Sequence, residues 1–121
     1  MMDSHTLFIL WLKSFAFTLV LEAPVFGLVG WKTAPVWRLL AAGAAGTCIT
    51  HPALWFLWPR LFRDYTTYIV TGELLVSIIE SFTFYALARP ITLLKAVSAS
   101  FLANATSYGC GVIMHKLGML T

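Results

Sequence analysis

All three glutamates of this chain, Glu22, Glu73 and Glu80, lie inside long apolar stretches of the sequence. A charged side chain at the centre of a membrane-spanning helix costs about 2.5–3.5 kcal/mol, so three ionised glutamates without partners would cost roughly 8–10 kcal/mol. Each of them therefore needs a proton, a polar partner, a bound metal ion or contact with water. Both aspartates, Asp3 and Asp64, lie outside the apolar stretches.

Two more side chains in these stretches can take part in the same chemistry: His51 and Asn104, which is the only asparagine. Imidazole suits zinc, iron or nickel, and oxygen ligands suit magnesium or manganese. We therefore expect a substrate-binding or ion-binding site built from Glu22, His51, Glu73, Glu80 and Asn104. If the cofactor is a divalent metal ion, its expected ligands are His51 and the three glutamates. The sequence contains no HExxH, ExxH or CxxC spacing, so no known metal motif supports this ligand set.

Three functions fit these residues. In a small multi-pass transporter or channel, the glutamates and His51 would bind a cation or a protonatable substrate inside the membrane and move it. In a metal-dependent intramembrane enzyme, the same ligands would hold a metal ion that activates water against a lipid-borne substrate. In a structural subunit, the polar groups would only join helices within a larger membrane complex. No catalytic residue is assigned, because no serine or cysteine stands in a motif that would activate it.

The elements that must position these residues are helices. Of the 121 residues, 60% are hydrophobic and 11% are charged, and the mean hydropathy is +0.84, which is typical of an integral membrane protein. A spanning helix needs roughly 20 mostly apolar residues. Glycine, proline and charged residues divide the chain into four such stretches, at about 7–29, 36–58, 66–88 and 91–113. The sequence therefore predicts an all-α, up-down four-helix membrane bundle that forms one domain over residues 1–121.

A rise of 1.5 Å per residue gives each polar side chain an expected depth in such a bundle. His51 and Glu73 fall about 10 Å from the face that carries the N-terminus, whereas Glu22 and Glu80 fall about 21–22 Å from it. Glu73, Ser77 and Glu80 share one helix face because they are spaced by four and three residues. We expect two half-sites along this polar stripe, not one cluster of three glutamates.

The second and fourth predicted helices each carry a face of small and polar residues that lets another helix approach closely. These faces are Gly43, Thr47 and His51 in the second helix, and Ser100, Asn104, Ser107 and Gly111 in the fourth. Pro24 and Pro52 lie just after Glu22 and His51, and each removes one backbone hydrogen bond from its helix. We expect kinks there, with freed carbonyls available to a ligand.

Basic residues do not determine the orientation, because each predicted membrane face receives four of them. One face has Lys13, Arg60, Arg63 and Lys116, and the other has Lys32, Arg38, Arg89 and Lys95. We expect the protein to contact the lipid bilayer of a bacterial or archaeal cell membrane, as a homo-oligomer or a subunit of a membrane complex, without nucleic acid. The difference in depth between Cys48 and Cys110 excludes a disulfide between them. No internal repeat is evident in the amino-acid sequence.

Overall fold

The computed structural model describes residues 3–118, and every regular element in that range is helical. The four long helices are α1 (Ser4–Val29), α2 (Val36–Pro52), α3 (Tyr65–Leu87) and α4 (Leu93–Lys116). α2 continues without a break into the short helices η1 (Ala53–Leu57) and η2 (Trp58–Leu61). The prediction of four helices and no strands is confirmed for the described residues. The predicted helix boundaries at residues 29, 36 and 88 agree with the structure to within one residue.

Capping side chains explain where three of the helices begin. Asp3 accepts a hydrogen bond from the Thr6 N–H at 2.7 Å, and Asp64 accepts one from the Thr67 N–H at 2.8 Å. These bonds to the N–H groups hold the pKa of both aspartates below its usual value. The Thr92 hydroxyl accepts a bond from the N–H of the third residue of α4, at 3.2 Å. Capping lengthens α1 by three residues over its predicted start, and it delays α4 by two.

The two intrahelical prolines act differently. Pro24 lies inside α1, and the helix runs through it as one element. Pro52 is the last residue of α2, and the chain beyond it winds into a π-helical turn and then a 3-10 turn. The expected disruption therefore occurs at Pro52, where the loss of a backbone donor changes the helical hydrogen-bond pattern.

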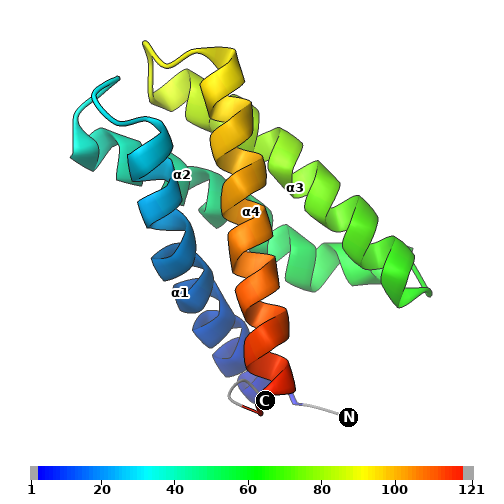
Figure 1. Ribbon diagram of the computed structural model, residues 1–121. Coiled ribbons are helices and arrows are strands. Elements are labelled where there is room, and N and C mark those ends of the chain that lie inside the picture. The colour runs from blue at the N-terminus through cyan, green and yellow to red at the C-terminus, as the bar shows by residue number, and fades with distance from the viewer. Residues whose placement is uncertain (1–2, 119–121) are drawn as a thin grey trace.

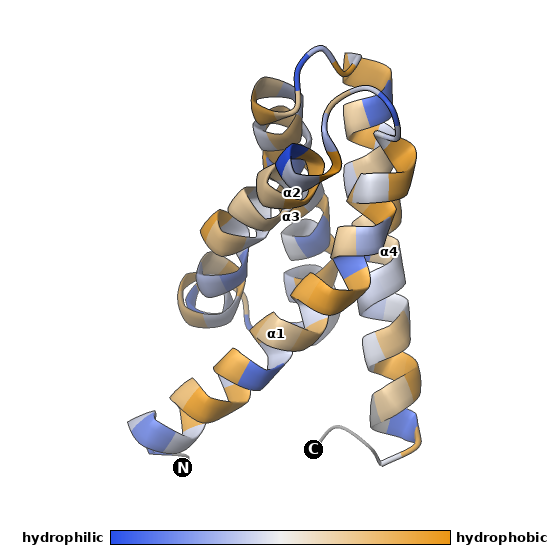
Figure 2. Cartoon of the chain, turned by 90° about the vertical axis from the view of Figure 1, so that its left-hand side faces the viewer, coloured by the Kyte–Doolittle hydropathy of each residue, from blue (hydrophilic) through white to orange (hydrophobic). Residues whose placement is uncertain are grey.

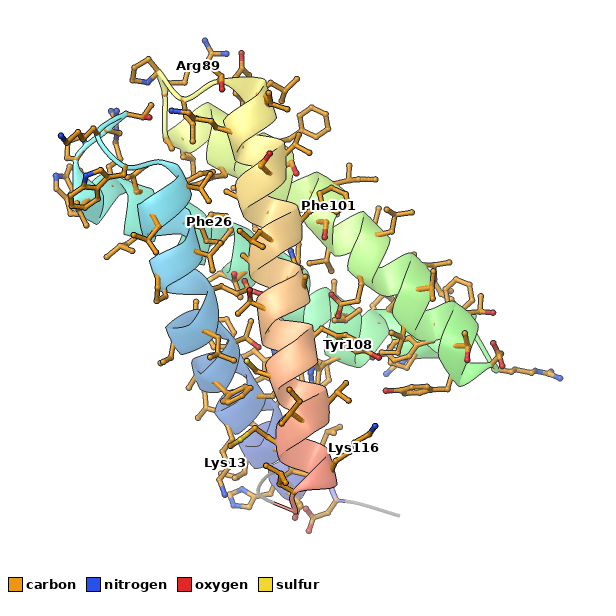
Figure 3. The ribbon with its side chains drawn as sticks, in the orientation of Figure 1. Lys13, Phe26, Arg89, Phe101, Tyr108 and Lys116 are labelled. Atoms are coloured by element: carbon orange, nitrogen blue, oxygen red, sulfur yellow. The ribbon has the colours of Figure 1, made fainter. Side chains whose placement is uncertain are left out.

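Each long helix packs against its two neighbours in a closed ring: α1 with α2, α2 with α3, α3 with α4, and α4 with α1. Figure 1 shows α1 and α3 running in one direction and α2 and α4 returning. Figure 3 places Lys13 and Lys116 at one end of the molecule and Arg89 at the other. Neighbours in sequence are thus neighbours in space, as the short loops predicted.

Three of the helical stretches are long and apolar enough to cross a membrane: Ser4–Val29, Val36–Leu61 and Tyr65–Leu87. α4 is 24 residues long but does not reach the same apolarity, because it carries several serines, one asparagine and one threonine. In Figure 2 orange and tan predominate on α1, whereas α4 shows a run of white and pale blue ribbon. Many large apolar side chains lie exposed on the outside of the helices; among them are Val20, Leu28, Val70, Phe82 and Leu94. An outer surface of this kind suits a lipid environment.

The apolar core lies toward the end of the bundle that carries the α1–α2 and α3–α4 loops. Phe26 and Phe84 face each other there with ring centroids 4.6 Å apart, and both are fully buried. Buried alanines of α4 complete the core: Ala96, Ala99 and Ala103. Small residues at these positions let α4 approach the phenylalanines closely. The polar side chains lie on the other side of this core, toward mid-bundle.

The structure contains a repeat of two helical hairpins, α1–α2 and α3–α4. A shift of 58 residues takes the end of α1, Val29, to the end of α3, Leu87, and a shift of 57 takes the start of α2, Val36, to the start of α4, Leu93. Buried positions recur with the same shifts. Examples are Glu22 and Glu80, Phe26 and Phe84, Leu39 and Ala96, Ala42 and Ala99, and Thr47 and Asn104. Three of these five pairs share their residue type and two differ, so the repeat is visible in burial and, at these positions, partly in residue identity. The sequence alone had not made this repeat evident.

Candidate functional site

Glu22 is buried at mid-bundle, with 2% of its surface exposed. Its Oε1 accepts a hydrogen bond from the Thr47 hydroxyl of α2 at 3.0 Å. Its Oε2 accepts one from the Ser107 hydroxyl of α4 at 2.7 Å. The carboxyl group of α1 is therefore held between α2 and α4.

Glu80 of α3 has the same exposure, 2%, and a matching pair of partners. Its Oε2 accepts a hydrogen bond from the Thr50 hydroxyl of α2 at 2.7 Å. Its Oε1 accepts one from the Asn104 amide of α4 at 2.9 Å. Gly46 of α2 makes room for this side chain, because a Cβ at that position would lie 3.1 Å from the Glu80 Cγ.

We call these six side chains the carboxyl network: Glu22, Thr47, Thr50, Glu80, Asn104 and Ser107. It follows the hairpin repeat, since Glu22, Thr47 and Thr50 correspond to Glu80, Asn104 and Ser107. Each carboxyl group takes one donor from its own hairpin and one from the other hairpin. The network thus joins all four helices at one depth.

Each hydroxyl of the carboxyl network has a choice of acceptor. The Thr50 hydroxyl lies 2.7 Å from Glu80 and 3.0 Å from the Gly46 carbonyl oxygen. The Thr47 and Ser107 hydroxyls likewise lie 3.3 Å from the carbonyl oxygens of Gly43 and Asn104. A hydroxyl has one hydrogen and can also accept one. It can donate to an ionised carboxylate, or it can donate to the carbonyl and accept from a protonated carboxyl. Every hydroxyl contact in the network therefore tolerates both protonation states of the glutamates.

Glu73, predicted as a site residue, lies outside the carboxyl network. It is half-buried on α3, and no hydrogen bond joins it to another described side chain. It is close enough to Glu22 and Glu80 for their charges to interact with its own. Within residues 3–118, the expected layer of Glu73 and His51 is not formed as a hydrogen-bonded pair.

His51 is buried among aromatic rings, with 7% of its surface exposed. Its ring centroid lies 5.5 Å from that of Phe15 and 6.2 Å from those of Trp11 and Trp55. The Nε2 atom of His51 is buried and has no hydrogen-bond partner among the described residues. His51 thus lies in an aromatic cluster apart from the carboxyl network.

The structure does not bring the four predicted metal ligands together. Across residues 3–118, no three His, Cys, Asp or Glu side chains lie close enough to hold one metal ion. Cys48 and Cys110 are both free thiols, as predicted. A divalent metal cofactor bound by His51, Glu22, Glu73 and Glu80 stays a prediction that this arrangement does not support.

Three residues of the carboxyl network were not among the predicted site residues: Thr47, Thr50 and Ser107. Thr47 and Ser107 belong to faces that the sequence marked as helix-packing surfaces, and Thr50 belongs to neither. A signal was present in the spacing, because Thr47 and Thr50, like Asn104 and Ser107, are three residues apart and therefore share a helix face. Spacing alone could not show that each pair serves two carboxyl groups on opposite helices.

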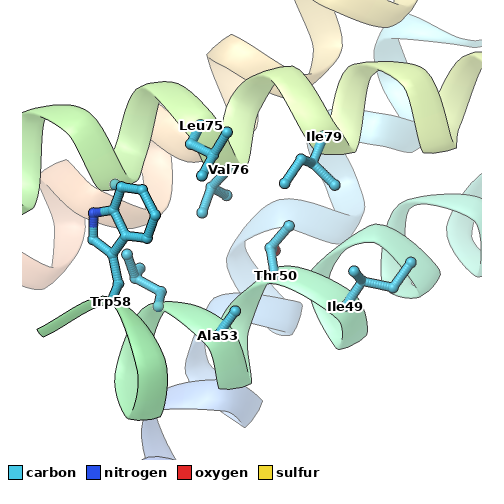
Figure 4. A pocket seen from close by; sticks show the side chains of 9 residues that line it. Ile49, Thr50, Ala53, Trp58, Leu75, Val76 and Ile79 are labelled. Atoms are coloured by element: carbon cyan, nitrogen blue, oxygen red, sulfur yellow. The ribbon is translucent and has the colours of Figure 1, made fainter. Parts of the chain in front are cut away.

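Two small pockets open beside the network. One, of about 90 Å³, lies between α2 and α3 and exposes only apolar surface; Figure 4 shows the side chains that line it, among them Trp58, Leu75 and Ile79. The other, of about 200 Å³, lies between α1 and α2 and includes Glu22 and Thr47 in its lining. Only the second pocket reaches a carboxyl group of the network.

Searches against known protein families, curated proteins and solved structures find no match to this chain.

Proposed function

We propose that the protein is a small multi-pass membrane transporter that binds protons at Glu22 and Glu80 and exchanges them for a cation or a protonatable substrate. The observation that carries this proposal is the carboxyl network itself. Two carboxyl groups, each 2% exposed, are held among the described side chains only by neutral donors from threonine, serine and asparagine. None of these four donors neutralises a negative charge.

The charges of the carboxyl network favour proton exchange over a role only in joining helices. Burying an ionised carboxylate without a counter-charge is costly, and a proton or a bound cation removes that cost. A network built only to join helices needs neither, because uncharged side chains could make the same contacts. The threonine and serine hydroxyls can follow a change of protonation by turning between a carboxyl oxygen and a backbone carbonyl. The proposed site is therefore a pair of carboxyl groups that can gain and lose protons while the helices stay packed.

Ion exchange across a vesicle membrane tests the proposal directly. The purified protein is reconstituted into liposomes that contain a pH-sensitive dye and have an acidic interior. Na⁺, K⁺, methylammonium or benzyltrimethylammonium is then added outside. We expect at least one of these cations to make the lumen alkaline faster than in protein-free liposomes. We expect that response to disappear in Glu22→Gln and Glu80→Gln.

Glu73→Gln is the matched control, since it removes a carboxyl group from the same helix as Glu80 but from outside the network. It should keep most of the wild-type response. Wild-type liposomes that behave like protein-free liposomes with all four cations would contradict the proposal and favour a structural subunit. An equal loss in Glu73→Gln and Glu80→Gln would show that the network is not the site.

A further inference from the structure

The pocket between α1 and α2 is an apolar groove whose lining includes one glutamate. Its walls are formed by Leu19, Ala23, Phe26, Leu40 and Ala44, and its polar lining residues are Glu22 and Thr47. The volume is about 200 Å³, and the exposed surface inside the groove is mostly apolar. Glu22 presents almost no surface to the outside, so a ligand would reach it only by filling the groove.

The groove faces the outer, apolar surface of the bundle. Leu40, in its wall, is 37% exposed, and Val20 and Leu28 nearby on α1 are 71% and 72% exposed. In a membrane these side chains would contact lipid. A ligand would then enter sideways from the bilayer, and it would need apolar groups of its own to be present there.

We infer that this groove binds a lipophilic monovalent cation, with its apolar part between α1 and α2 and its positive charge against the Glu22 carboxylate. The inference rests on the proposed function and names its substrate class. Charge complementarity selects a cation. The Glu22 carboxylate would repel an anion, and a neutral hydrocarbon would leave that carboxylate without a counter-charge. The apolar walls select a lipophilic cation over Na⁺ or K⁺, since a small hydrated ion gains nothing from contact with leucine and phenylalanine.

Comparison of the two hairpins shows why the groove is found in the first hairpin. With the shift of 57 residues, Phe101 occupies the position of Ala44, and Ser100 occupies the position of Gly43. Figure 3 shows Phe101 on α4, on the side away from α1. Alanine and glycine therefore leave open on α2 a space whose counterpart on α4 carries larger side chains. This difference singles out Glu22 as the carboxyl group that meets the ligand.

Gly43 also sets the shape of the groove. A Cβ at Gly43 would overlap the ring of Phe26, so the close approach of that ring depends on glycine. The ring in turn forms one wall of the groove and contacts the ring of Phe84 of the second hairpin in a tilted arrangement. Ligand binding is thus linked to the contact between the two hairpins.

Binding of a permanent cation should release a proton from Glu22 to the solvent, with no other bond made or broken. Glu73 and Glu80 of α3 lie close enough to Glu22 for its charge to act on theirs. The other titratable side chains described on the helices that pack against α1 are Arg38, Cys48 and His51 of α2, and Lys95, Tyr108, Cys110 and Lys116 of α4. None of these side chains donates a hydrogen bond to Glu22, whose donors are Thr47 and Ser107.

The test uses benzyltrimethylammonium, a permanent cation with one aromatic ring, and its uncharged isostere neopentylbenzene. Each is added to the detergent-solubilised full chain in weak buffer with a pH indicator, and the cation is also titrated by calorimetry. We expect proton release and saturable binding with the cation, and neither proton release nor competition with neopentylbenzene. Glu22→Gln should abolish proton release and weaken cation binding by more than about tenfold, as expected when a desolvated charge loses its counter-charge.

Two matched substitutions separate the groove from the carboxyl group. Ala44→Phe places in the groove the side chain that the second hairpin carries at Phe101. It should weaken cation binding by more than about tenfold, because the phenyl ring takes the space in which the ligand would contact the apolar walls. Ala41→Phe puts the same side chain on an exposed position of α2 outside the groove, and it should bind like the wild type. Circular dichroism of each variant reports whether the helices are retained.

The outcomes distinguish this inference from the proposed function. No saturable binding of benzyltrimethylammonium to the folded wild type, together with Glu22-dependent Na⁺ or K⁺ exchange in liposomes, overturns the lipophilic cation and leaves the proposed function standing. Equal binding by Ala44→Phe and wild type overturns the groove as the site. Absence of both binding and exchange overturns both proposals.

Discussion

At the scale of single residues, the most informative feature is that each buried carboxyl group has two neutral donors. Glutamine can replace a protonated glutamate here, because its amide can donate to the Thr50 hydroxyl, which then donates to the Gly46 carbonyl. Alanine cannot. It leaves the Thr50 hydroxyl and the Asn104 amide without the partners they contact at 2.7 and 2.9 Å. Structure and charge can therefore be separated at this one position.

We predict that Glu80→Gln changes the free energy of unfolding by less than about 1 kcal/mol, because its hydrogen bonds can be remade. Glu80→Ala should destabilise the protein by about 2–4 kcal/mol, since it leaves a cavity and unsatisfied buried polar groups. Denaturation in mixed micelles, followed by circular dichroism, measures both values. Equal destabilisation by glutamine and alanine would mean that Glu80 is ionised in the folded protein.

At the scale of helices, glycines decide how closely neighbours approach. Gly43 and Gly46 lie where α2 meets the side chains of Phe26 and Glu80, whereas a Cβ at Gly109 of α4 would meet nothing within 4 Å. The tight contacts are therefore in the middle of α2 and not on the C-terminal half of α4. Small-residue faces in both helices look alike in the sequence, and only their surroundings differ.

This difference gives a prediction with an internal control. Gly43→Ala should destabilise the protein by about 1–3 kcal/mol, the usual cost of overpacking a well-packed site. Gly109→Ala should be neutral or stabilise by up to about 1 kcal/mol, because alanine favours the helix over glycine. Thermal unfolding of the two variants and the wild type measures both changes in stability. A larger loss at Gly109 would mean that α4 has a close neighbour in the native membrane assembly.

At the scale of the whole molecule, the chain is two hairpins that share one polar network. Two of its bonds cross between them: Ser107 to Glu22 and Thr50 to Glu80. The rings of Phe26 and Phe84 make a further contact between the hairpins. Because each hairpin has its own short loop, continuity at residues 62–64 is not needed for any of these contacts.

We predict that residues 1–62 and 63–121, expressed as two separate chains, assemble into a complex with the helical content of the intact protein. Affinity purification of one tagged half should recover the other in a one-to-one ratio. Glu22→Ala in the first half should reduce recovery, because it removes the acceptor for Ser107 across the interface. Recovery of each half only as a homodimer would show that the two hairpins can replace one another.

The sequence by itself predicted the four helices, their order, and the burial of Glu22 and Glu80. Apolar runs of about 20 residues and the cost of charges within them leave few other arrangements. Depth along the helices also placed Glu22 and Glu80 at one level, and the structure joins them there through α2 and α4.

Only the tertiary structure decided which polar side chains meet. The direction in which a side chain points depends on the rotation of its helix and on its neighbours, and spacing along the chain does not determine either. For this reason His51 lies in an aromatic cluster, Glu73 lies outside the network, and Thr50 lies within it. The hairpin repeat likewise became evident only in three dimensions, because packing preserves burial and hydrogen bonding even where the residues that provide them differ, as at Thr47 and Asn104.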